Sequence, residues 1–152
     1  MKLGNVVRVL ALAGACAAAI GSAASQSGQQ GSAQALVSPP PAQPMEAFRA
    51  LGLWKSTFGA VKIEPDDSRG GLAAGAVHGV WVYQRQGQEI VGYFSGGLRG
   101  NVLSLRWQEP GAQPLVGEGF LVFDPMGRQF GGRWWTARRD GGGDWNGWRQ
   151  PT

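Results

Sequence analysis

Tryptophan recurs along this chain with a nearly constant period. Trp54, Trp81, Trp107 and Trp134 follow one another at separations of 27, 26 and 27 residues. A period of this length corresponds to one supersecondary unit, and here it fits a β-hairpin with its turns. Every second strand would then carry one of these Trp residues, and all four would point to the same face near the same end of the sheet. The period therefore predicts an all-β fold.

Glycine accompanies tryptophan in this pattern. The chain has 26 glycines among 152 residues, and three of the periodic Trp residues stand in a Gly-x-Trp motif. Other glycines fall inside the expected strands, at Gly92, Gly117, Gly119, Gly131 and Gly132. Strand glycines allow the sharp coiling of a tight barrel and are often covered by a neighbouring aromatic ring. We expect the four Trp side chains to form a core layer packed over such glycines.

Short apolar segments separated by turn residues predict about seven strands. They are expected at residues 53–63, 76–84, 88–95, 101–108, 115–124, 128–136 and 144–149. The first segment is long enough to bend or to carry a bulge at Gly59, and turns are expected at residues 95–97 and 124–127, among others. Every proline after residue 44 lies between apolar runs or at the very end of the chain, as a sheet requires. Residues 44–51 predict one or two helical turns.

The short connections between successive strands favour an antiparallel up-and-down meander. Such a meander either closes into a small barrel or folds into a sandwich. The barrel is the first choice because closure removes exposed sheet edges. A β-solenoid with one turn per period is a third architecture, and it is less favoured because the Trp107 segment lacks the preceding glycine.

Glycine and aromatic positions form a recurring series over residues 53–149. The series is carried by residues 54–59, 89–92, 119–123, 127–134 and 145–149. It resembles a widespread group of small bacterial exported β-meander domains with Gly-x-Trp and Gly-x-Phe-x-Phe strands. The architecture is also loosely similar to avidin-like and lipocalin-like barrels. The resemblance implies a fold and carries no activity, cofactor or catalytic residue.

The first residues have the composition of a secretory signal peptide. Lys2 and Arg8 precede an uncharged apolar run at residues 9–20, and small residues follow up to Ala24. The run is shorter than the roughly 20 residues of a membrane-spanning helix. Three regions are therefore predicted: a cleaved signal peptide at 1–24, a disordered Ser/Gln/Gly/Pro linker at 25–44, and the β-meander domain at 45–152.

Export places the mature chain in the periplasm or outside the cell, without a transmembrane helix. Cys16 is the only cysteine, so the mature chain would contain no disulfide. Residues 13–16 loosely match a lipobox, and lipidation of Cys16 is a minor alternative to cleavage near Ala24.

Residues capable of catalysis are few. His78, the only histidine, lies at the start of an expected strand, and the chain has no Gly-x-Ser-x-Gly motif, so the sequence gives no sign of a Ser-His-Asp triad. One histidine leaves too few ligands for a zinc site, so no metal and no cofactor are predicted. Glu118, Glu89 and Asp124 are weak catalytic candidates. Glu118 stands between two glycines, where burial in the lumen would raise its pKa. With Glu89 or Asp124 as its partner, Glu118 would form the paired carboxylates of a hydrolase acting on an envelope polymer.

Arginine and tryptophan are interleaved near the C-terminus. Arginine among aromatic rings can stack on planar or sugar rings and hold anionic groups. The candidate binding residues are Trp135, Trp145, Trp148, Arg133, Arg138, Arg139 and Arg149. Loss of Lys2 and Arg8 with the signal peptide would lower the formal charge from +4 to +2.

Export makes nucleic acid a poor partner for such a surface, so no nucleic-acid binding is predicted. A glycan, an anionic lipid headgroup or a protein of the cell envelope fits better. The expected function is an exported, non-catalytic binding or interaction module that uses a barrel mouth or this C-terminal surface. The hydrolase is the alternative.

Overall fold

The computed structural model describes residues 38–149. The predicted signal peptide with Cys16 and most of the predicted linker lie outside the described residues. The compact unit begins at Pro39. The backbone N–H of Gln43 donates to Asn101 Oδ1 at 2.6 Å, and the Asn101 N–H donates to the Gln43 carbonyl at 2.9 Å. The contacts of the β-domain therefore extend to Gln43, two residues before the expected boundary at Met45.

Twelve elements follow in the described part of the chain. Three are short 3₁₀ helices, η1 (Ala47–Ala50), η2 (Asp67–Arg69) and η3 (Leu72–Ala74). The strands are β1 (Gly52–Ser56), β2 (Gly59–Pro65), β3 (Ala76–Arg85), β4 (Gln88–Arg99), β5 (Val102–Glu109), β6 (Leu115–Phe123), β7 (Gln129–Thr136), β8 (Gly142–Asp144) and β9 (Gly147–Arg149). Within residues 38–149, every helix is too short to cross a membrane.

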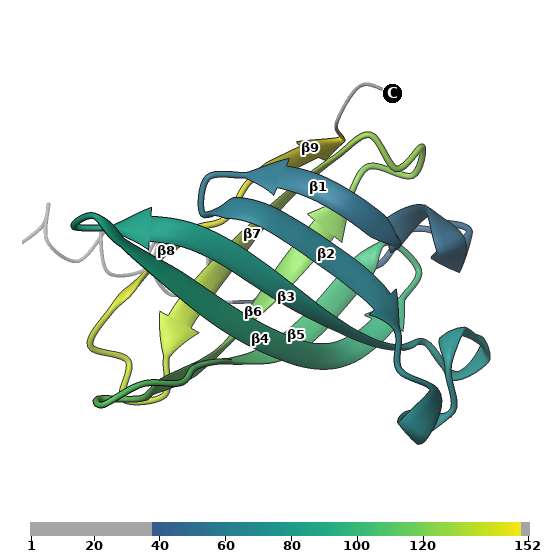
Figure 1. Cartoon of the computed structure of the whole chain (residues 1–152). Coiled ribbons are helices and arrows are strands. Elements are labelled where there is room, and N and C mark those ends of the chain that lie inside the picture. The colour runs from purple at the N-terminus through teal and green to yellow at the C-terminus, as the bar shows by residue number, and fades with distance from the viewer. Residues whose placement is uncertain (1–37, 150–152) are drawn as a thin grey trace, which may run out of the picture. The chain divides into compact units, whose positions relative to one another are not determined.

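The strands form an antiparallel barrel (Figure 1). Each strand from β1 to β7 pairs with the next, and β9 then pairs with both β7 and β1. Eight strands thereby close the sheet on itself, while β8 is an extra strand paired with β7. The predicted up-and-down meander and its barrel form are confirmed. The sandwich and the solenoid are excluded.

The first predicted strand, at residues 53–63, is in fact a hairpin. β1 and β2 pair in the register Ser56↔Gly59, which leaves Thr57 and Phe58 as a two-residue turn. Gly59 has φ +80°, and a Cβ there would lie 2.0 Å from the Val82 carbonyl oxygen. The Ser56 hydroxyl donates to the Gly59 carbonyl and accepts the Phe58 N–H. The prediction missed this reversal because Thr-Phe is not a typical turn sequence.

Two further segments differ from the prediction. Residues 95–97 are part of β4, where Gly96 and Gly97 pair with Leu105 and Ser104, and the chain reverses instead at Gly100, with φ +56°. In place of the last predicted strand, at residues 144–149, the structure has two short strands, β8 and β9, with Trp145 and Asn146 between them. The Trp145 N–H still donates to the Gly132 carbonyl of β7 at 2.9 Å, and its side chain is buried in the barrel.

Aromatic rings fill the barrel interior and cover strand glycines. A Cβ on Gly92 would lie 2.1 Å from the Trp81 ring, and one on Gly117 would lie 2.4 Å from the Trp107 ring. At both positions only glycine leaves room for the indole. The expected packing of Trp over strand glycines is thus confirmed for these two pairs.

The two ends of the barrel have different connections. At one end lie the turns after β1 and β3 and the loops at residues 110–114 and 137–141; we call this the open end. At the other end lie η1, the turn at residues 124–128 and the end of β9; we call this the closed end. In Figure 1 the open end is on the left and the closed end on the right.

Candidate functional site

The open end of the barrel contains a cavity of about 450 Å³. This volume lies within the range of roughly 300–1,000 Å³ that is usual for small-molecule sites. Its lining is mostly aromatic, with a few polar side chains. The lining residues are Phe58, Trp81, Tyr83, Arg85, Trp107, Glu109, Leu115, Trp134, Thr136 and Trp145.

Strand geometry explains why three periodic Trp residues meet in this cavity. Trp81, Trp107 and Trp134 are each the sixth residue of their strands, β3, β5 and β7, which run in the same direction. Their rings therefore lie at a similar height in the barrel. Trp54 is the third residue of β1 and lies nearer the closed end. The expectation that all four share one level is right for three of them.

The indole and phenyl rings of the wall pack edge to face. The Trp107 ring lies with its centroid 6.3 Å from that of Trp81 and 5.9 Å from that of Trp134. Phe58, from the β1–β2 turn, contacts Tyr83 and Trp134 with centroid distances of 5.7 and 5.8 Å. Such pairs gain about 0.5–1.5 kcal/mol beyond simple burial. The wall is therefore a preformed apolar surface.

A polar cluster stands at the mouth of the cavity. The Tyr83 hydroxyl donates to Glu109 Oε1 at 2.7 Å, and Arg85 Nη2 donates to Glu109 Oε2 at 2.7 Å and to the Tyr83 oxygen. Burial raises the pKa of Tyr83. The hydrogen bonds to Tyr83 and Glu109 raise the pKa of Arg85. The cluster is thus a neutral tyrosine with an ion pair, and Nε and Nη1 of Arg85 have no hydrogen-bond partner within residues 38–149.

One polar atom in the cavity wall lacks a partner. Trp134 Nε1 is buried and makes no hydrogen bond to any other described residue. The corresponding atoms of Trp54, Trp107 and Trp145 each donate to an oxygen, at 3.0, 3.1 and 3.1 Å. An unsatisfied buried donor costs about 1–3 kcal/mol. The atom lies beside Gly143 of β8, where a Cβ would stand 3.2 Å from it.

The predicted C-terminal binding residues do not share one surface. Trp145 is buried and lines the cavity, whereas Trp148 is exposed on β9. Trp135 points out of the barrel, with the Arg139 guanidinium 5.5 Å from its ring centroid. Arg133 Nη1 bonds Asp144 Oδ1 at 2.8 Å, and Arg138 is exposed in the loop after β7.

Arg149 has a structural position at the closed end. Its guanidinium carbon lies 3.9 Å from the Trp54 ring centroid, and it donates to the carbonyls of Gly127 at 3.1 Å and Leu53 at 3.5 Å, and to that of Arg49. Burial lowers its pKa. These bonds connect η1, β1 and the β6–β7 turn. The group is therefore used within the fold rather than presented to a ligand.

The three candidate acids do not meet. Glu118 lies between Gly117 and Gly119, whose faces point inward, so strand alternation directs its side chain outward, toward Arg106 at 4.0 Å. The lumen-facing position expected for Glu118 is therefore wrong. Asp124 is six residues farther along the chain, about 20 Å in extended conformation. Its carboxylate accepts the N–H groups of Met126, Arg128 and Gln129.

Glu89 lies opposite Gln84 beside the β3–β4 turn. Through the register of β4, β5 and β6, Glu118 is level with Ser95, so Glu89 is also about 20 Å away along β4. A glycosidase needs two carboxyl groups roughly 5–9.5 Å apart. The described residues offer no such pair among these three acids.

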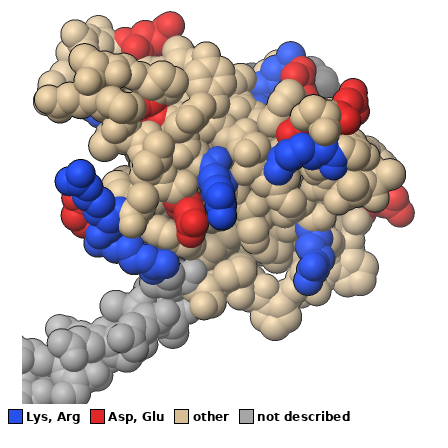
Figure 2. Space-filling model, turned by 90° about the horizontal axis from the view of Figure 1, so that it is seen from below, with Lys and Arg blue, Asp and Glu red and all other residues tan. Residues whose placement is uncertain are grey.

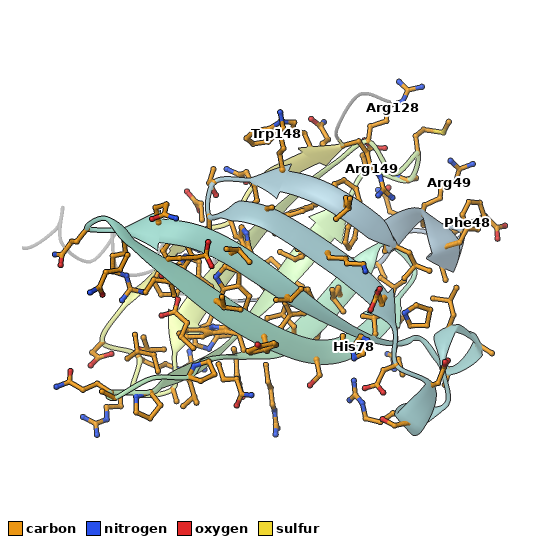
Figure 3. The ribbon with its side chains drawn as sticks, in the orientation of Figure 1. Phe48, Arg49, His78, Arg128, Trp148 and Arg149 are labelled. Atoms are coloured by element: carbon orange, nitrogen blue, oxygen red, sulfur yellow. The ribbon has the colours of Figure 1, made fainter. Side chains whose placement is uncertain are left out.

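The remaining charged groups are dispersed. His78 is exposed on β3, with Nε2 3.7 Å from Glu64 Oε2 (Figure 3). Figure 2 shows acidic and basic side chains interspersed on a mostly uncharged face. Among residues 38–149, no three His, Cys, Asp or Glu side chains gather in a way that could hold a metal ion.

Sequence reasoning missed most of the polar lining, although a signal for it was present. Tyr83 and Arg85 stand two and four residues after Trp81, Glu109 stands two after Trp107, and Thr136 two after Trp134. Side chains at even spacing share one face of a strand. Once the Trp residues point inward, these polar residues at the strand ends must lie at the mouth of the barrel.

The chain was also compared with known proteins. It matches no family model, and neither a curated protein nor a solved structure is significantly similar to it.

Proposed function

We propose that this protein is an exported, non-catalytic binding protein that takes a small, largely apolar molecule into the cavity at the open end. The observation that supports the proposal most strongly is the aromatic cavity itself, which combines Trp81, Trp107 and Trp134 with a few polar groups at its mouth. Concave, mainly apolar sites with a few placed polar groups are the usual form of a small-molecule site.

The lining favours one chemical class of ligand. Apolar walls suit a ring or short hydrocarbon, since a glycan would lose water from its hydroxyl groups without gaining partners. A hydrogen-bond acceptor on the ligand has a donor at the mouth of the site, the guanidinium of Arg85. The ligand is therefore an apolar molecule with at least one acceptor group. The hydrolase alternative lacks support, because Glu118, Glu89 and Asp124 lie apart.

Binding of anilinonaphthalene sulfonate, an apolar dye with one anionic group, tests this function. We expect saturable dye binding with quenching of tryptophan emission. Leu115→Trp, at the rim of the cavity, should weaken dye binding by about tenfold or more, because the larger ring blocks the entrance.

Val116→Trp is the matched control, since Val116 is the next residue and its exposed side chain lies outside the cavity lining. This variant should bind the dye as the unmodified chain does. Circular dichroism establishes that both variants fold. Equal dye affinity in the two variants, or no binding by the unmodified chain, contradicts the proposed function.

A further inference from the structure

Large apolar side chains remain exposed at the closed end, away from the cavity. Phe48 on η1, Leu53 on β1 and Met126 in the β6–β7 turn are 58%, 60% and 55% exposed. Scattered exposed apolar residues are common on protein surfaces, whereas neighbouring ones indicate an interaction site. The question is therefore whether these three side chains belong together.

Arg149 shows that they do. One guanidinium donates to the carbonyl of Leu53 and to those of Arg49 and Gly127, the residues that directly follow Phe48 and Met126. Arg49 adds a second link, because its guanidinium lies 5.5 Å from the Phe48 ring centroid and its Nη1 donates to the Met126 carbonyl at 3.1 Å. The three exposed side chains thus surround two arginines that hold their backbones together.

Trp148 extends this surface along the barrel wall. It is 46% exposed on β9, opposite Lys55 of β1 and Gln129 of β7. Figure 3 shows Phe48, Arg49, Arg128 and Trp148 along one edge of the molecule, with Phe48 and Arg128 directed away from the ribbon. We call Phe48, Leu53, Met126, Trp148, Arg49, Lys55 and Arg128 the closed-end patch.

The patch carries an excess of positive charge. Its three cations stand with Glu46 before η1 and Asp124 in the β6–β7 turn, whereas Lys62, opposite Leu53, pairs with Glu64 on its own strand. The Asp124 carboxylate already accepts three backbone N–H groups of its own turn. Arg149 adds a fourth, partly buried cation. An anionic partner therefore complements this surface.

We propose that the closed-end patch docks on the surface of an anionic lipid bilayer. Exposed Trp and Phe side chains among Arg and Lys are the combination that enters the headgroup region, where rings are buried and cations meet lipid phosphates. Each basic residue near such a surface contributes an attraction of order 1 kcal/mol, or roughly fivefold in affinity. The apolar groups are single side chains from separate elements, which suits insertion between headgroups.

Docking in this way is compatible with the cavity and independent of it. The cavity opens at the other end of the barrel, so its mouth would face the aqueous side while the closed-end patch faces the lipid. The proposal does not require a ligand in the cavity.

Co-sedimentation with lipid vesicles tests the proposal. The purified full chain is mixed with vesicles of phosphatidylcholine alone, or of equal parts phosphatidylcholine and phosphatidylglycerol. We expect clear binding to the anionic vesicles, weaker binding to the neutral ones, and loss of binding at high salt.

Two pairs of variants locate the contact. Phe48→Ser/Met126→Ser should bind anionic vesicles at least about tenfold more weakly, whereas Tyr93→Ser/Val116→Ser, which removes similarly exposed residues elsewhere, should not. Lys55→Gln/Arg128→Gln should lose about tenfold or more, and Arg99→Gln/Arg106→Gln much less. Unchanged dye binding in the cavity confirms that each variant is folded.

Three results would overturn the proposal. The first is that the unmodified chain does not bind anionic vesicles. The second is that the patch variants and their controls bind equally. The third is that light scattering finds a dimer which only Phe48→Ser/Met126→Ser dissociates, with no vesicle binding, since the patch would then join two copies of the chain.

Discussion

The two ends of the barrel use the same residue type for different purposes. At the closed end, Trp54 is 1% exposed, packs against Phe123 and Phe130 and is covered by the Arg149 guanidinium. At the open end, Trp134 is only half-buried and its ring forms part of a cavity wall. The period directs both residues inward. Whether a Trp becomes core or wall depends on what fills the space beside it.

The largest expected difference between the ends is in stability. Trp54→Ala should lower the free energy of unfolding by about 3–5 kcal/mol, because it leaves a large cavity among packed rings. Trp134→Ala should cost only about 1–2 kcal/mol, since part of its ring already faces open space and an unsatisfied N–H is removed. Chemical denaturation measures both. Equal losses would show that the open end is packed as tightly as the closed end.

Arg149 gives the next largest effect. Arg149→Lys should lower the free energy of unfolding by about 2–3 kcal/mol, because a lysine cannot reach three carbonyls on different elements at once. Arg128→Lys, an exposed neighbour in the β6–β7 turn, should change stability by less than about 0.5 kcal/mol. Dye binding in the cavity should be unaffected by both, and a marked loss in Arg149→Lys would mean that the ends are coupled.

A strand glycine tests the packing of the cavity wall. Gly92→Ala should destabilise the protein by about 1–3 kcal/mol and weaken dye binding, because the new Cβ would lie 2.1 Å from the Trp81 ring and push it into the cavity. Gly97 lies on the same strand with open space around its Cβ position. Gly97→Ala should therefore be neutral or slightly stabilising. Unfolding and dye titrations that do not distinguish the two variants would contradict this account of the wall.

The smallest expected effect is a pH dependence at the mouth. Burial raises the folded-state pKa of Tyr83, so its stabilising contribution is fully present below the unfolded tyrosine value of about 10 and is lost as pH rises through the higher folded value. A Tyr93→Phe variant leaves Tyr83 as the only tyrosine. The absorbance of the Tyr83 tyrosinate should then appear at a higher pH than that of a free tyrosine, whose pKa is about 10. Ionisation of Tyr83 at or below the pH at which a free tyrosine ionises would mean that the mouth is open to water.

The sequence predicted the architecture because two local rules agree over the whole chain. Period-two alternation sets the inward face of each strand, and the Trp period places that face on every second strand. The packing of Trp rings over strand glycines was also predicted, whereas the particular glycines under Trp81 and Trp107 depend on the strand register. The register and the lengths of the strands were less predictable. The Thr57-Phe58 turn and the extension of β4 through Gly96 and Gly97 depend on partners in neighbouring strands.

Only the tertiary structure decided the function of each aromatic and charged residue. Alternation directs Trp54 and Trp134 inward alike, but the volume left beside each ring depends on the position of the Trp in its strand and on the connections at that end. The roles of the arginines could not be predicted from the sequence either, because their partners are distant along the chain. Arg149 donates to three carbonyls on different elements, whereas Arg85 pairs with Glu109 at the mouth of the cavity. Local sequence patterns specify whether a side chain points into or out of the barrel. The cavity beside a Trp ring and the distant partners of an arginine exist only once the sheet has closed.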